Sequence, residues 1–301
     1  MSKEAQDERI KEAVREAYGG IAQQVDGSGQ RASCCGPGQR SSCCGPAADS
    51  AEVVLLDEPL PSSRFYSDDE LAGLPETVTG ASLGCGNPIA IAGLQPGEVV
   101  LDLGSGGGID CFLAARQVGP EGRVIGLDMT PDMIKLARRN AHKLGVTNVD
   151  FRFGEMEEMP LADGSVDVII SNCVINLSPD KEAVFREAYR VLRPGGRVSI
   201  SDIVVDGDLP QAIRGRLDAW AGCIAGALDE GVYLNLMRAA GFERIEVVSR
   251  DYAEVEGAEA AQMLAEDGDG AAEALLAETG LTPQALAHRI ASIKVRAYKA
   301  G

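Results

Sequence analysis

Three cysteines stand in sequence contexts that could bring their thiols to one place. Cys85 lies in SLGCGNP, Cys173 in SNCVINLSPDK and Cys223 in WAGCIAGAL. Their long separations fit no local metal-binding signature, and a single buried cysteine such as Cys111 is usually a small apolar side chain. Cys173, however, ends an apolar strand-like run, and open α/β sheets bind ligands at the carboxyl ends of their strands. We therefore expect the Cys173 thiol to lie beside a ligand.

Histidine chemistry is nearly excluded, because the chain has only two histidines, His142 and His288. His142 lies among Arg138, Arg139 and Lys143, which is typical of a solvated helix face. Catalysis by a Ser/His/Asp triad and a histidine-rich metal site both need more than this. The chemistry of the chain therefore depends on other side chains.

The glycine-rich stretch LDLGSGGGID predicts a nucleoside site. It follows a predicted strand and opens a predicted helix, where Gly104, Gly106 and Gly108 permit a tight turn and a close approach of the backbone to a ligand. The dinucleotide fingerprint needs a small residue where this chain has Ile109, which disfavours NAD. Asp128 ends the next strand, where a carboxylate can accept hydrogen bonds from both ribose hydroxyls. Alternatively, Asp128 only caps a turn and the glycines only pack strand on helix.

A parallel sheet must position these residues. The nearly continuous apolar runs VVLDL, RVIGLD, VDVIISN and RVSISDI are typical of strands buried on both faces, and RIEVVS and ASIKVRAY predict two more strands. The patterns also predict seven helices, two of them with a Thr130 or Ser178 cap before a first-turn proline: the first eighteen residues, Ser67–Leu74, Ile109–Val118, Pro131–Lys143, Pro179–Val191, Gly231–Ala240 and Glu254–His288. The alternation of strands and helices predicts a doubly wound α/β domain.

Composition excludes several classes of partner. The 301 residues carry 28 Lys+Arg against 46 Asp+Glu, a net charge of −18, so that nucleic acid and anionic membrane surfaces would be repelled. Aromatic residues make up only 4% of the chain, too few for base-stacking platforms. The charged first eighteen residues have no apolar signal-peptide core, and the longest uncharged stretch, 77–97, is broken by glycine and proline. We therefore expect a cytoplasmic protein whose thiols are mostly reduced.

From about Pro96 to Asp202 the chain resembles the class I S-adenosylmethionine-dependent methyltransferases. The resemblance rests on VVLDLGSGGG, Asp128, SVDVIISN and LRPGGR. It implies a Rossmann-like, mostly parallel seven-stranded sheet, with VVLDLGSGGG at the methionine end of S-adenosylmethionine, Asp128 at its ribose and Gly154-Glu155-Met156 near its adenine. The cofactor-binding residues that it implies are Asp102, Gly104, Ser105, Gly106, Asp128, Met129, Gly154, Glu155, Met156 and Asn172.

The three cysteine segments extend this resemblance to roughly residues 65–242. SLGCGNP, SNCVINLS and GCIAGAL match arsenite methyltransferases in their order along the chain. The family implies that Cys85, Cys173 and Cys223 are catalytic and bind trivalent arsenic, with arsenite and methylarsenite as substrates. It also implies a thiol reductant, glutathione or a thioredoxin-type partner, as co-substrate. The expected domains are a helix plus flexible Cys-rich arm at 1–50, the cofactor-binding domain at 51–208, and a C-terminal α+β arsenic-binding region at 209–301 that completes the sheet.

The chemistry of thiolates is consistent with trivalent arsenic as the ligand. Soft thiolates prefer soft centres, and three of them in a pyramid leave the lone pair of arsenic free to face a methyl group. In-line displacement then needs alignment and close approach and no general base, which agrees with the scarcity of histidine. Cys85 lies between glycines in a loop outside the predicted strands, so we expect it to have the greatest backbone freedom of the three cysteines.

Two CCGP copies place four further cysteines in the arm, Cys34, Cys35, Cys43 and Cys44. They could capture arsenic and deliver it, bind zinc through four thiolates, form an oxidisable linker, or belong to a dispensable tail. Their adjacent spacing differs from C-x₂-C, which disfavours zinc. Two alternatives for the whole chain stay open: a methyltransferase for a small organic acceptor, whose site needs an apolar pocket and a general acid or base, and a non-catalytic metalloid-sequestering protein.

Overall fold

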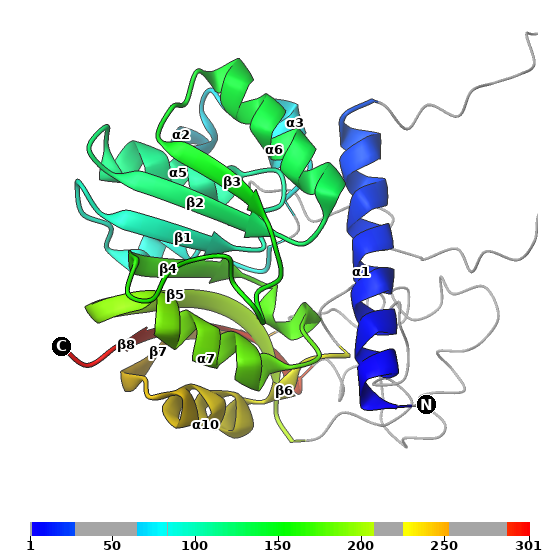
Figure 1. Ribbon diagram of the computed structural model, residues 1–301, viewed down its shortest axis with the longest axis vertical. Coiled ribbons are helices and arrows are strands. Elements are labelled where there is room, and N and C mark those ends of the chain that lie inside the picture. The colour runs from blue at the N-terminus through cyan, green and yellow to red at the C-terminus, as the bar shows by residue number, and fades with distance from the viewer. Residues whose placement is uncertain (1, 28–64, 83, 208–224, 253–287) are drawn as a thin grey trace, which may run out of the picture.

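A mixed sheet with helices on both faces forms the molecule (Figure 1). The computed structural model describes residues 2–27, 65–82, 84–207, 225–252 and 288–301. The strand order is β3-β2-β1-β4-β5-β8-β7, and the short β6 pairs with β5. Strands β1 to β5 are parallel, whereas β8 is antiparallel to both β5 and β7. The strands are β1 Val99–Leu103, β2 Arg123–Asp128, β3 Val149–Phe153, β4 Val166–Asn172, β5 Leu192–Val205, β6 Leu228–Asp229, β7 Glu243–Tyr252 and β8 Ile290–Tyr298.

The two faces of the sheet bury separate apolar clusters. Leu101 and Leu103 of β1 pack in the cluster that holds Phe185 of α7 and Tyr233 of α10, whereas Val100 packs in the cluster of α4, α5 and α6. The expected doubly wound, mostly parallel fold is therefore confirmed. The helices are α1 Lys3–Val25, α2 Asp68–Leu71, α3 Glu76–Thr79, α4 Ile89–Ala92, α5 Ile109–Val118, α6 Pro131–Leu144, η2 Ile175–Leu177 (a 3₁₀ turn), α7 Lys181–Val191 and α10 Glu230–Ala240.

Several elements differ from the sequence-based expectation: α3, α4 and η2 were not predicted, and α2 ends at Leu71 where the helix was expected to reach Leu74. β3 was not among the predicted strands, because its charged residues Asp150 and Arg152 interrupt the apolar pattern. β6 adds a short eighth strand to the expected seven. The helix expected from Pro179 begins at Lys181, because the Asp180 carboxylate accepts the Ala183 N–H at 3.0 Å and caps it there. Residues 254–287 of the helix expected at Glu254–His288 lie outside the described residues.

Helix α1 lies along the carboxyl edge of the sheet (Figure 1). It extends to Val25, seven residues beyond the predicted eighteen, and Ile21 and Ala22 pack against Met133 and Leu136 of α6. Gln23 also donates to the Asp132 carboxylate at 2.9 Å. Because ligands of this sheet type bind at the carboxyl edge, α1 is placed to form a wall of the site. Among the helices of the described ranges, none has an apolar stretch long enough to cross a bilayer.

Candidate active site

The glycine loop between β1 and α5 has the conformation that its sequence predicts. Gly104, Gly106 and Gly108 have φ values of +65°, +50° and +98°, which glycine adopts without strain. A Cβ at Gly104 would lie 2.5 Å from Cγ1 of Val174, the residue after Cys173. The loop therefore packs directly on the segment that carries this thiol.

Asp128 at the end of β2 holds the glycine loop. Its carboxylate accepts the Gly106 N–H at 2.9 Å and the Thr130 N–H at 2.8 Å. Burial raises the pKa of Asp128, although these backbone hydrogen bonds act in the opposite direction. The carboxylate therefore caps a turn, as the alternative interpretation has it, and also lines the cavity described next.

A cavity at the carboxyl edge brings together most of the predicted cofactor-binding residues. It also includes residues of α1 and of the segment before Cys85, which were not predicted. Its lining contains the predicted residues Asp102, Gly104, Ser105, Gly106, Asp128, Met129, Gly154, Met156 and Asn172, and also Val14, Tyr18, Ala81, Ser82, Gly84 and Cys173.

Two buried carboxylates, Asp102 and Asp110, line one side of this cavity. Asp102 accepts a hydrogen bond from the Cys111 thiol at 3.2 Å, and Asp110 accepts one from the Tyr66 hydroxyl at 2.9 Å. Burial raises the pKa of Asp110 to about 6, and burial together with Asp110 raises the pKa of Asp102 well above its ordinary value. A buried acidic pair of this kind favours a cationic ligand.

Cys111 is fully buried, as expected, but it is not only an apolar side chain. Its thiol donates to Asp102, and burial, followed by the charge of that carboxylate, raises the pKa of Cys111 well above its ordinary value. The group is therefore a neutral thiol and a poor nucleophile.

Cys85 and Cys173 meet at the cavity. The structure joins them in a disulfide with a Cα–Cα distance of 5.6 Å, so the expectation of mostly reduced thiols is not met for this pair. Cys173 has φ +62°, a left-handed conformation that non-glycine residues rarely adopt, and its N–H donates to the Ser201 carbonyl at 2.8 Å. A strained backbone conformation of this kind persists only where the surrounding structure enforces it. In this protein the strained residue, Cys173, lies in the turn that follows β4.

The Cys85 loop is held firmly, so the expectation of backbone freedom is wrong. Its N–H donates to the Asn172 side chain at 3.1 Å, and its carbonyl accepts the Ser292 hydroxyl at 3.0 Å. A Cβ at Gly84 would lie 2.3 Å from the Asn172 amide, and one at Gly86 would lie 2.8 Å from the Ser201 hydroxyl. Glycine is therefore needed here for close packing more than for flexibility.

The remaining predicted cysteines lie outside the described residues: Cys223, Cys34, Cys35, Cys43 and Cys44. Within the part of the chain that the structure describes, no group of three or more His, Cys, Asp and Glu side chains is arranged to hold a metal ion. The assignments of these five cysteines remain predictions.

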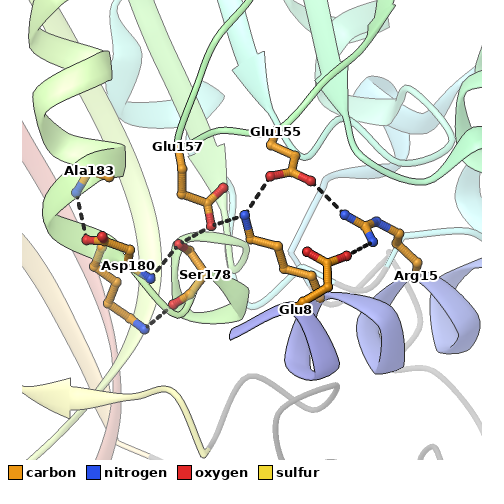
Figure 2. A network of polar contacts seen from close by, with 9 residues as sticks. Glu8, Arg15, Glu155, Glu157, Ser178, Asp180 and Ala183 are labelled. Atoms are coloured by element: carbon orange, nitrogen blue, oxygen red, sulfur yellow. Dashed lines mark hydrogen bonds and ion pairs between the residues drawn. The ribbon is translucent and has the colours of Figure 1, made fainter. Parts of the chain in front are cut away.

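Glu155 is the predicted cofactor residue that does not line the cavity. Its carboxylate accepts Lys11 at 2.5 Å and Arg15 at 2.6 Å, both from α1 (Figure 2). Burial alone would raise the pKa of Glu155, but the two cations outweigh it and lower the pKa. Lys11 also lies 3.4 Å from Glu157, which accepts the Ser178 hydroxyl at 2.6 Å. These ion pairs fix α1 over the cavity, and the role of Glu155 at the adenine stays a prediction.

Comparison with known proteins identifies the family. A family model described as a methyltransferase domain matches residues 94–265. An X-ray structure of an arsenic(III) S-adenosylmethionine methyltransferase from Chlamydomonas reinhardtii is 37% identical with a TM-score of 0.63, and the match covers 80% of this chain and 75% of that chain. The chain belongs to the arsenite methyltransferase family.

Two curated arsenite methyltransferases show how much of such a protein this family member spans. The one from Halobacterium salinarum is 47% identical over 245 residues, which is 81% of this chain and 60% of that protein. The one from Mus musculus is 35% identical over 211 residues, which is 67% of this chain and 55% of that protein. The chain therefore spans 60% or less of the length of these two relatives.

Sequence reasoning missed the contribution of α1 to this family member's site. Val14 and Tyr18 lie four residues apart, so their spacing predicts only a buried face and not what that face covers. Tyr66 and Asp110 were missed as well, because nothing in their neighbourhood distinguishes them from ordinary helix and loop residues. A clue existed for Asp110: a buried acid in the first turn of an apolar helix needs a partner.

Proposed function

We propose that this chain transfers methyl groups from S-adenosylmethionine to trivalent arsenic, first as arsenite and then as methylarsenite. The observation that carries the proposal is the meeting of Cys85 and Cys173 at the wall of the glycine-loop cavity. Thiolates are the protein ligands best suited to a soft, thiophilic centre. A thiol pair at the methyl-donor cavity has no comparable purpose in a methyltransferase for an organic acceptor.

The cavity suits S-adenosylmethionine, which supplies an electrophilic methyl group on a cationic sulfonium. Asp102 and Asp110 are buried acids whose ionised forms a cation stabilises, and the Ser105 hydroxyl is buried without a hydrogen-bond partner among the described residues. Gly104 and Gly106 leave the backbone open to a ligand, and we assign the ribose hydroxyls to Asp128, which lines the cavity. We assign the remaining contacts to Met129, Gly154, Glu155, Met156 and Asn172.

Cys223 would complete a three-thiolate arsenic site with Cys85 and Cys173. Before arsenic can bind, the disulfide must be reduced, and two equivalents of a monothiol would give two protein thiols and one oxidised disulfide of the reductant. We propose glutathione or a thioredoxin-type protein for this step, in a reducing compartment such as the cytoplasm. Three thiolates leave the arsenic lone pair as the nucleophile, so no general base is required.

Separation of arsenic species tests the proposal. The reduced protein is incubated with S-adenosylmethionine, glutathione and arsenite, and methylated arsenicals are expected together with S-adenosylhomocysteine. Bound arsenite without methylated product would favour a sequestering protein. Consumption of the cofactor only in the presence of a small organic acceptor would favour the other alternative.

Cofactor affinity is expected to fall as the pH decreases through about 6. A cationic ligand favours ionised Asp110 and lowers its pKa. At a pH below about 6, where Asp110 is protonated in the free protein, binding of the ligand therefore displaces this proton. One displaced proton reduces affinity by up to about tenfold for each pH unit below 6. Calorimetric titration at several pH values measures the slope, and Asp110→Asn is expected to flatten it. A flat profile for the unmodified chain would contradict the role of Asp110.

The Cys-rich arm is expected to matter only when arsenite is scarce. Because α1 lines the cavity, deletion of residues 1–50 would damage the cofactor site, and serine replacements of Cys34, Cys35, Cys43 and Cys44 are the better test. If the arm raises the local arsenite concentration, the apparent KM for arsenite increases and kcat does not change. Zinc at one equivalent in the purified protein, lost in the variant, would refute delivery of arsenic.

A further inference from the structure

The side chain of Asn172 connects the cofactor cavity with the Cys85 loop. Its oxygen accepts the Cys85 N–H at 3.1 Å, and its amide nitrogen lies 2.8 Å from the Gly86 carbonyl. The same nitrogen lies 3.2 Å from the Asp110 carboxylate and 2.9 Å from the Tyr66 hydroxyl. Asn172 therefore touches both the loop that carries one thiol and the buried acid that faces the cavity.

The position of Asn172 in the chain strengthens this connection. It is the last residue of β4, and the next residue is Cys173 in its strained conformation. One rigid strand end therefore supplies the Cys173 thiol through the backbone and fixes the Cys85 thiol through the Asn172 side chain. The loop backbone lies directly against this amide, because a Cβ at Gly84 would overlap it.

We propose that Asn172 is a positioning residue that sets the place of the Cys85 thiol relative to Cys173 and couples it to occupation of the cofactor cavity. The amide donates toward Asp110, so a cationic ligand that stabilises ionised Asp110 strengthens the same hydrogen bond that orients the amide. Orientation of the amide in turn fixes the Cys85 backbone. The inference deepens the proposed function, because it concerns how two of the proposed arsenic ligands are held.

The alternative is that Asn172 acts only on the cofactor, as the resemblance of the sequence implies. Its nitrogen already contacts Gly86, Tyr66 and Asp110, and its oxygen contacts Cys85. The protein itself therefore orients this side chain before any ligand binds, and a ligand can only add to that orientation through Asp110. Loss of the Asn172 side chain should therefore disturb the thiol pair even when the cavity is empty.

The thiol–disulfide equilibrium between Cys85 and Cys173 tests this without arsenic. In the 301-residue chain, serine replaces Cys34, Cys35, Cys43, Cys44 and Cys223, which leaves the buried Cys111 as the third cysteine. Equilibration with reduced and oxidised glutathione gives the effective concentration of one thiol at the other. The reaction is balanced, since the two protein thiols lose two electrons and two protons to the oxidised reagent. The measurement is repeated with saturating S-adenosylmethionine.

Asn172→Ala is expected to lower the effective concentration by about tenfold or more, because loss of the hydrogen bonds frees the Cys85 loop. S-adenosylmethionine is expected to raise the effective concentration in the reference chain and to leave that of Asn172→Ala unchanged. By reciprocity, disulfide formation strengthens cofactor binding by the same factor in the reference chain. Asn172→Asp keeps the acceptor for Cys85 and loses the donor toward Asp110, so it is expected to retain much of the positioning and lose the coupling.

Ser292→Ala is the matched control, because Ser292 also bonds the Cys85 backbone but does not line the cavity. It is expected to lower the effective concentration less than Asn172→Ala and to keep the response to S-adenosylmethionine. Equal effects of the two variants on both quantities would overturn the inference, as would an unchanged equilibrium in Asn172→Ala. Thermal unfolding shows whether Asn172→Ala is folded. If it is not, the equilibrium constant of Asn172→Asp and its response to S-adenosylmethionine decide whether the inference holds. Failure here leaves the arsenic-methylation assay unaffected, so the two proposals are tested separately.

Discussion

Replacing Cys173 by serine is expected to abolish methylation of both arsenite and methylarsenite, with rates at least about 10²-fold lower. A serine hydroxyl is not ionised at neutral pH and is a poor ligand for a soft centre. Serine fits the same volume, and the left-handed backbone of residue 173 can be kept. Separation of arsenic species measures the rates. Unchanged affinity for S-adenosylhomocysteine would show that the cofactor cavity is intact, and activity on either substrate would refute the thiol site.

Cys85→Ser is expected to distinguish the two substrates. Arsenite has three exchangeable positions and can bind three protein thiolates, whereas methylarsenite has two, so one cysteine becomes dispensable after the first methyl transfer. Cys173 follows directly on the last residue of core strand β4, whereas Cys85 lies in a loop whose backbone donates to the Asn172 side chain and accepts from the Ser292 hydroxyl. We therefore expect Cys85→Ser to lose activity on arsenite and keep much of it on methylarsenite. Equal effects on both substrates would contradict either the argument from the number of exchangeable positions on arsenic or the choice of Cys85 as the dispensable cysteine.

Asp128→Ala is expected to weaken cofactor binding by more than about tenfold and to leave arsenite binding by the reduced protein largely intact. The variant loses charge-assisted hydrogen bonds to the ribose, each contributing about 1.5–3 kcal/mol. It also leaves the Gly106 and Thr130 N–H groups without their present acceptor, so the glycine loop loses an anchor. Calorimetric titration with S-adenosylmethionine measures the affinity.

Asp132→Ala is the control for Asp128→Ala. Asp132 lies four residues further along the chain, in the first turn of α6, and bonds Gln23 and Lys135 on the surface. Its replacement removes the same charge from a residue that does not line the cavity, and with it only one outer contact of α1, so it should not change the affinity for S-adenosylmethionine. Unchanged affinity in Asp128→Ala, or equal losses in the two variants, would rule out Asp128 as the ribose ligand.

The parallel core of the sheet and the loop that follows β1 could be predicted from local residue patterns. Continuous apolar runs predict strands buried on both faces, and a parallel arrangement then brings every strand end to one edge. Gly104 and Cys173 each follow such a strand and Asp128 ends one, so their proximity follows from topology alone. These predictions succeed because the sheet's periodicity and its glycine conformations are local properties.

The surroundings of that edge could not be predicted in this way, because contacts between distant segments form them. The amphipathic pattern of α1 shows that Val14 is buried but cannot show against what, and its salt bridges join Lys11 and Arg15 to a residue 140 or more positions away. The firmness of the Cys85 loop likewise depends on Asn172, 87 positions along the chain. The glycines beside Cys85 predict a flexible loop backbone, whereas close packing holds that backbone in place. Local residue patterns cannot show this, because the contacts come from distant segments of the chain.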